Sequence, residues 1–118
     1  MVAPQVPRTA RSNFGVNMGW PDKFIERLQA GETVKFRPRG NSMKGKIESG
    51  QLCTVAPITN IDTLAIDDIV LCRVRGTQYL HLVKALREGQ FQIGNNRGGI
   101  NGWIGPKAIF GILTDVSH

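Results

Sequence analysis

Apolar and polar residues alternate along several short stretches of the chain, which is the pattern of strands that bury one face. The clearest stretch is Thr33–Arg37, where the charged Lys35 separates Val34 from Phe36. Segments that contain glycine or proline separate it from five other stretches of similar or greater apolar content. The pattern therefore predicts six short strands, at Thr33–Arg37, Leu52–Ala56, Ile69–Val74, Tyr79–Leu86, Phe91–Ile93 and Ile109–Asp115.

One segment has a helical pattern instead. A Pro-Asp pair near its beginning and Gly31 just past its end frame a helix over Trp20–Ala30. The apolar side of this helix consists of Phe24, Ile25 and Leu28. Six strands and one short N-terminal helix indicate a mainly β protein, built as a compact β barrel or sandwich.

The length and composition suit a single domain with one core. Residues 1–19 contain prolines, glycines and basic side chains without a sustained period, so we expect a flexible basic arm ahead of a domain over 20–118. The hydrophobic content of 41% is ordinary for a globular chain of 118 residues. No apolar run approaches the roughly 18–20 residues of a spanning helix, and the N-terminus has no apolar signal region. We therefore expect a cytoplasmic protein without membrane contact.

The net charge of +6 is concentrated in residues 1–46, which hold nine basic and three acidic side chains, while residues 47–118 are balanced. Such an excess is compatible with an acidic partner such as nucleic acid. A basic segment that merely keeps the surface solvated is the commoner explanation, because neither a recognition helix nor an aromatic–basic platform accompanies the charge.

Several kinds of chemistry find no support in the sequence. The two histidines are His81 and His118, so no cluster has the spacing of a metal site, and we expect neither metal nor cofactor. Cys53 and Cys72 lie in apolar stretches without CxxC spacing, which predicts reduced, buried thiols. The Gly/Asn-rich segment Gly94–Gly102 leads from one strand to another, and we expect it to be a surface loop.

Ser42 is the best candidate nucleophile among the four serines. It follows the glycine-containing turn Pro38–Asn41 and precedes Met43 and a short helical turn. A nucleophile on such a corner exposes its hydroxyl, while nearby backbone N–H groups converge on a substrate oxyanion.

Two side chains on the strand Tyr79–Leu86 could act as the base for Ser42. His81 is the obvious candidate for a Ser–His pair. Strand alternation places Lys84 on the same face as two leucines, where a lysine either extends to solvent or is desolvated, with a lowered pKa that lets the neutral amine act as a base. From the strand pattern alone, a structural role for Lys84 is favoured.

The order of these motifs resembles that of the LexA/UmuD-like peptidases and the related signal peptidases. The strand that ends in Gly40-Asn41-Ser42-Met43 is similar to the strand and G-x-S-M box of these families. Their I-x-x-G-D, G-D-I-V and x-V-K segments have similar counterparts at Ile47–Leu52, Asp67–Val70 and Leu82–Lys84. Gln51 stands where the family usually has Asp, and Asp67 where it usually has Gly.

The resemblance implies a fold of the LexA C-terminal-domain type and a serine endopeptidase with a Ser–Lys dyad. Ser42 would be the nucleophile, Lys84 the general base, and the backbone around Ser42 and Met43 the oxyanion site beside the substrate cleft. A homodimer is usual in such proteins. Since no helix-turn-helix precedes the domain, the chain resembles the short UmuD-like members.

The substrate implied by the resemblance is the protein's own arm or a segment of a regulatory partner protein, in an SOS-type stress response or a phage-regulatory role. The alternative is a catalytically silent module of the same fold, which binds a protein or uses basic residues 1–46 to bind nucleic acid.

Overall fold

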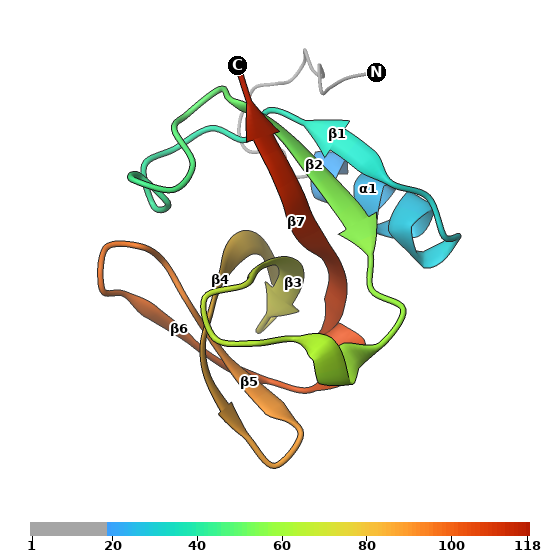
Figure 1. Cartoon of the computed structure of the whole chain (residues 1–118), viewed down its shortest axis with the longest axis vertical. Helices are drawn as coiled ribbons and strands as arrows, with labels where there is room; N and C mark the ends of the chain where they lie inside the picture. Colours follow the sequence, from blue (N-terminus) through green and yellow to red (C-terminus); the bar gives the residue numbers. More distant parts are fainter. Residues whose placement is uncertain (1–18) are drawn as a thin grey trace.

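The computed structural model describes residues 19–118, whose strands form one curled antiparallel sheet with a helix packed against it (Figure 1). The strands follow the spatial order β1-β2-β7-β3-β4-β5-β6, so β1 and β6 are the two edges. The elements are α1 (Gly19–Gln29), β1 (Val34–Phe36), β2 (Leu52–Pro57), the 3₁₀ turn η2 (Ile61–Thr63), β3 (Ile69–Val74), β4 (Thr77–Arg87), β5 (Gln90–Gly94), β6 (Ile100–Ile104), the 3₁₀ turn η3 (Pro106–Ala108) and β7 (Ile109–Ser117).

The prediction of a mainly β fold with one short helix is confirmed. The six expected strands all form, and a seventh, β6, begins inside the Gly94–Gly102 segment that was expected to be a loop. The flexible arm expected at residues 1–19 lies outside the described residues, except for Gly19, which begins α1. Within residues 19–118, the one α-helix is too short to cross a membrane.

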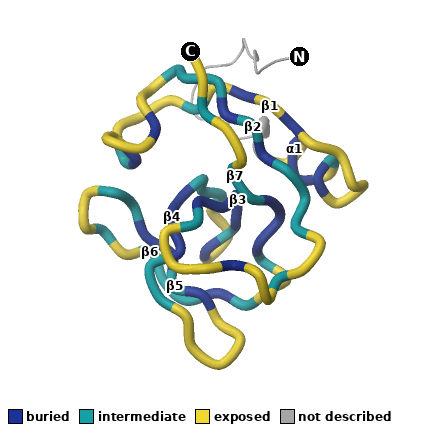
Figure 2. The backbone as a smooth tube through the Cα atoms, viewed as in Figure 1, coloured by how far each residue is buried: buried dark blue, intermediate teal, exposed yellow. Residues whose placement is uncertain are grey.

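Buried residues lie mainly on the strands and on α1, while most residues of the connecting loops are exposed (Figure 2). The apolar side of α1 packs against β1 and its neighbours through Phe24, Ile25 and Leu28, as the sequence predicted. Fully burying a side chain of this size contributes about 1.5–3 kcal/mol, so this face holds the helix on the sheet. Both cysteines are buried and free, in agreement with the sequence.

Strand β4 changes its pairing partner along its length. Thr77–Leu82 pairs with β3, and Leu82–Arg87 pairs with β5. A bulge between Val83 and Ala85 follows the change, so that Lys84 has no partner in β5. Bulges bend a strand and re-aim the side chain of the extra residue, and this one separates the surroundings of His81 from those of Lys84.

The tight turn between β3 and β4 determines which backbone N–H and C=O groups of β4 bond to β3 and which face away from it. Arg75 and Gly76 both have positive φ, 52° and 83°, as a two-residue hairpin turn requires. Hydrogen-bonded pairs then recur at every second residue, so Tyr79 and His81 direct their backbone groups toward β3. Gln78 and Leu80 direct theirs to the opposite edge.

Candidate active site

Ser42 lies on the loop of residues 37–51, between β1 and β2, which we call the nucleophile loop. Its two ends are joined where the Gly50 N–H donates to the Pro38 carbonyl at 2.8 Å. A second bond crosses the loop, from the Gly40 N–H to Ser49 Oγ at 3.1 Å. These two hydrogen bonds give the loop a defined shape, and they therefore hold the turn that carries Ser42 in place.

The residues that follow Ser42 anchor it to the core. Met43 and Ile47 are 5% and 4% exposed, and they pack with Cys53, Ile69 and Leu82. A helical turn connects them, closed by the Ile47 N–H donating to the Met43 carbonyl at 2.8 Å. Because Met43 is held in the core, the neighbouring Ser42 is fixed at the surface of the cleft.

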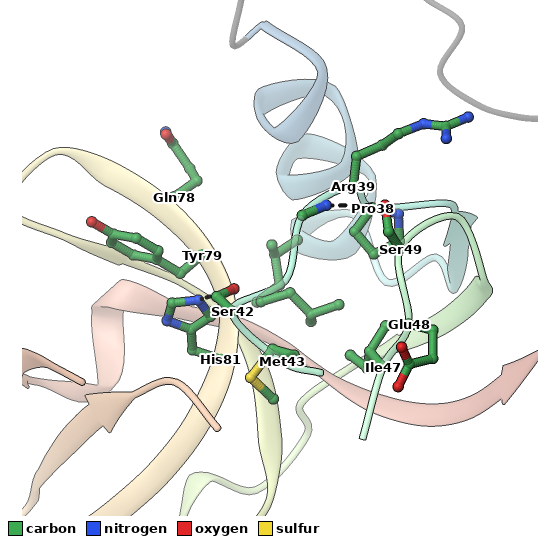
Figure 3. A pocket seen from close by; sticks show the side chains of 13 residues that line it. Pro38, Arg39, Ser42, Met43, Ile47, Glu48, Ser49, Gln78, Tyr79 and His81 are labelled. Carbon is green, nitrogen blue, oxygen red and sulfur yellow. Dashed lines mark hydrogen bonds between the residues drawn. The ribbon is translucent and has the colours of Figure 1, made fainter. Parts of the chain in front are cut away.

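The hydroxyl of Ser42 is hydrogen-bonded to His81, on β4. Ser42 Oγ lies 3.0 Å from His81 Nε2, and His81 Nδ1 lies 2.7 Å from Asn101 Oδ1, on β6 (Figure 3 shows the first contact). The ring of Tyr79 lies beside the imidazole, with 4.7 Å between the ring centroids. Ser42, His81 and Asn101 thus form one chain of hydrogen bonds.

This arrangement sets the protonation of His81. Asn101 Oδ1 can only accept, so Nδ1 carries the hydrogen and the lone pair of Nε2 faces the Ser42 hydroxyl. His81 is 6% exposed, and burial lowers its pKa from the ordinary 6.5, while the hydrogen bond with Asn101 opposes that effect. The imidazole is therefore neutral at neutral pH and able to accept a proton.

The turn between β5 and β6 holds the backbone of the nucleophile loop. The Asn96 N–H donates to the Ser42 carbonyl at 2.8 Å, and Asn96 Nδ2 donates to the Lys44 carbonyl, also at 2.8 Å. A Cβ on Gly45 would lie 3.0 Å from Asn96 Nδ2, so glycine there leaves room for this contact. One hairpin thus fixes Ser42 through Asn96 and His81 through Asn101.

Lys84 donates its hydrogen bond to the same hairpin. Its Nζ donates to the Asn95 carbonyl at 3.3 Å, and this carbonyl belongs to the peptide group whose N–H, from Asn96, bonds Ser42. A cation at the oxygen of a peptide group strengthens the N–H of that group as a donor. Lys84 therefore strengthens, indirectly, the hydrogen bond from the Asn96 N–H to the Ser42 carbonyl.

The Ser42–Lys84 dyad implied by the resemblance has no hydrogen bond between its two members. Among residues 19–118, no hydrogen bond joins Ser42 to Lys84. The reason is the bulge, which breaks the strand alternation at Lys84 and lays its stem over Gly94, where a Cβ would lie 2.9 Å from Lys84 Cγ. The sequence also indicated His81 as a candidate base for Ser42, and it is His81 that is hydrogen-bonded to Ser42.

Backbone donors are available beside the nucleophile. Within the described part of the chain, the N–H groups of Ser42 and Met43 donate to no protein acceptor. They lie on the turn that begins at Ser42. These are the donors that the sequence predicted for binding an oxyanion.

A cleft of about 190 Å³ separates the nucleophile loop from the first half of β4 (Figure 3). Ser42, Met43 and His81 line it, and Leu71 and Leu80 contribute an apolar wall. The pairing of β5 with β4 begins only at Leu82, so among the described residues no strand covers the β4 edge at Gln78–Leu80. The cleft therefore runs beside an unpaired strand edge.

Sequence reasoning missed Asn96 and Asn101. Both lie in the Gly94–Gly102 segment, whose glycines favoured a surface loop, and nothing in their spacing indicated contacts with Ser42 or His81. The described residues contain no cluster of His, Cys, Asp and Glu that could bind a metal.

No protein-family model matches this chain, and no curated protein matches it significantly. The resemblance to LexA/UmuD-like peptidases therefore rests on the motifs quoted above.

Proposed function

We propose that the protein is a serine peptidase in which Ser42 is the nucleophile, His81 the general base and Asn101 the group that orients it. The observation that carries the proposal is the hydrogen-bond chain from Ser42 Oγ through His81 to Asn101, beside a cleft. Geometry of this kind recurs in hydrolases of unrelated folds, which makes it more informative than the order of motifs. Lys84 takes a supporting role in place of the base.

In the first half of the reaction, Ser42 Oγ attacks a peptide carbonyl carbon as its proton passes to His81 Nε2. The N–H groups of Ser42 and Met43 bind the oxyanion. When the C–N bond breaks, His81 gives the proton to the leaving amine. Water then attacks the acyl ester, losing its proton to His81, and that proton returns to Ser42 Oγ as the ester C–O bond breaks.

The cleft suits an extended peptide. Gln78 and Leu80 direct backbone N–H and C=O groups toward the unpaired edge of β4, where a peptide can add as a strand. The apolar wall of the cleft would contact alternate side chains of such a peptide.

A fluorophosphonate probe tests the nucleophile directly. The reagent forms a bond from Ser42 Oγ to phosphorus and releases fluoride, and intact mass reports one added phosphonyl group. We expect labelling of the wild type, and at least about 10³-fold slower labelling of Ser42→Ala. Cleavage of a proteome-derived peptide library by the same samples reports peptidase activity.

Ser117→Ala is the matched control, because Ser117 is exposed at the end of β7, outside the cleft. It should be labelled like the wild type. Absence of labelling in the wild type, or labelling that persists in Ser42→Ala, would overturn the proposal and leave a binding module of the same fold.

A further inference from the structure

The nucleophile loop is strongly basic as well as reactive. Residues 37–51 hold four cations and one carboxylate: Arg37, Arg39, Lys44, Lys46 and Glu48. All four cationic residues are exposed. The charge of this loop therefore faces solvent, and Arg39 is the one of these four cations that lines the cleft.

Nothing in the described chain neutralises these cations. The ion pairs within residues 19–118 join Arg27 to Glu32 and Arg73 to Asp22, away from the loop. Glu48 is the acid on the loop, and its carboxylate accepts the Gly45 N–H at 3.0 Å. The loop thus keeps an excess positive charge that a ligand can meet.

Two of these cations, Arg39 and Lys44, belong to the backbone segments that flank Ser42. Arg39 lines the cleft together with Ser42. Lys44 is two residues from Ser42, and its carbonyl is fixed by Asn96 Nδ2 at 2.8 Å. A narrow cleft with low-dielectric walls strengthens the effect of charges along its rim.

We propose that this loop selects peptide segments with acidic side chains within about three residues of the scissile bond, the reach of a long basic side chain along an extended strand. The inference rests on the proposed function, since it names the substrate class of the same cleft. A peptide fits better than nucleic acid because the wall of the cleft is apolar, its neighbouring strand edge is open, and Glu48 lines it.

Binding to the Ser42→Ala variant tests the inference without requiring turnover. The probes are a fluorescein-labelled ten-residue peptide with glutamates on both sides of an apolar centre and its twin with glutamines, compared by fluorescence anisotropy. We expect the acidic peptide to bind at least about tenfold more tightly at low salt, with the difference collapsing at 0.5 M salt. Equal affinities would overturn the inference.

Charge reversal locates the effect. The double variant Arg39→Glu/Lys44→Glu should lose the preference, whereas Lys107→Glu, at an exposed position on η3 outside the cleft, should retain it. A preference that survives the double variant, or tighter binding of a ten-nucleotide single-stranded DNA than of the acidic peptide, would refute the inference.

The two proposals can fail separately. Wild-type protein that cleaves the peptide library without enrichment of Asp or Glu near the cut would refute the acidic preference and leave the peptidase intact. Absence of fluorophosphonate labelling together with selective binding of the acidic peptide would remove the peptidase and keep the preference of the loop.

Discussion

His81 lies in the first half of β4 and Lys84 in the second, and the two halves have very different surroundings. Thr77–His81 pairs with β3 alone, and its other edge opens on the cleft beside Ser42. Leu82–Arg87 is paired with β5, and there the bulge carries Lys84 onto the turn after β5. His81 consequently contacts the nucleophile and Lys84 contacts the turn that holds it.

The comparison indicates that strand pairing, and not basicity, decides which of the two side chains is hydrogen-bonded to Ser42. The two environments differ because Lys84 is an unpaired, bulged residue. The spacing of three residues between His81 and Lys84 does not reveal this bulge. The following three predictions test this division of roles.

Replacing each basic residue in turn should give the largest contrast. His81→Ala removes the proton acceptor, so we expect kcat/KM and fluorophosphonate labelling to fall by about 10⁴-fold. Lys84→Met keeps the stem and removes a charge that acts through the Asn95–Asn96 peptide group, so a loss of about tenfold or less is expected. The reverse ranking of the two variants would make Lys84 the base.

Loosening the hairpin should have an intermediate effect. Asn96→Ala removes the bond from Nδ2 to the Lys44 carbonyl and lets the Ser42 corner shift, so kcat should fall about 10–100-fold with KM nearly unchanged. Asn60→Ala is the control, since Asn60 caps η2 elsewhere and its loss should cost about 1 kcal/mol of stability without changing kcat. Equal kcat values for both variants would show that Asn96 does not position Ser42.

The smallest effect should be a shift in pH dependence. Only neutral His81 can accept the Ser42 proton, so activity should rise with pH through a midpoint below 6.5 and be flat above pH 7.5. In Asn101→Asp, a carboxylate beside Nδ1 stabilises the imidazolium, and the midpoint should rise by about one unit. A kcat/KM profile from pH 4.5 to 9.5 measures both. A rate that still climbs above pH 8 would instead indicate an amine base.

Much of the fold could be predicted from local pattern. The apolar side of α1 and the alternation of β1 both became buried faces, because periodicity directly reports which side chains share a face. Strand β6 escaped prediction because glycine and asparagine interrupt its apolar pattern. Asp67 stands where the LexA/UmuD-like peptidases usually have Gly, and this difference has a local explanation. Its φ of 80° falls in the region that glycine favours and aspartate tolerates.

The site was only half accessible to the same reasoning. Ser42 could be found because its turn is encoded in consecutive residues. Asn96 and Asn101 could not, because their contacts depend on how the β5–β6 hairpin lies across the nucleophile loop, which is a tertiary property. The bulge at Lys84 is likewise set by the pairing of β4 with two strands.

The two buried cysteines have a practical consequence for covalent chemistry on this protein. Burial raises the pKa of Cys53 to about 11 and that of Cys72 to about 12, so almost no thiolate exists at neutral pH. An electrophile therefore meets no competing sulfur while the sheet is intact. Since Cys53 lies on β2 and Cys72 on β3, in separate apolar clusters, their alkylation would report the opening of each part of the sheet independently.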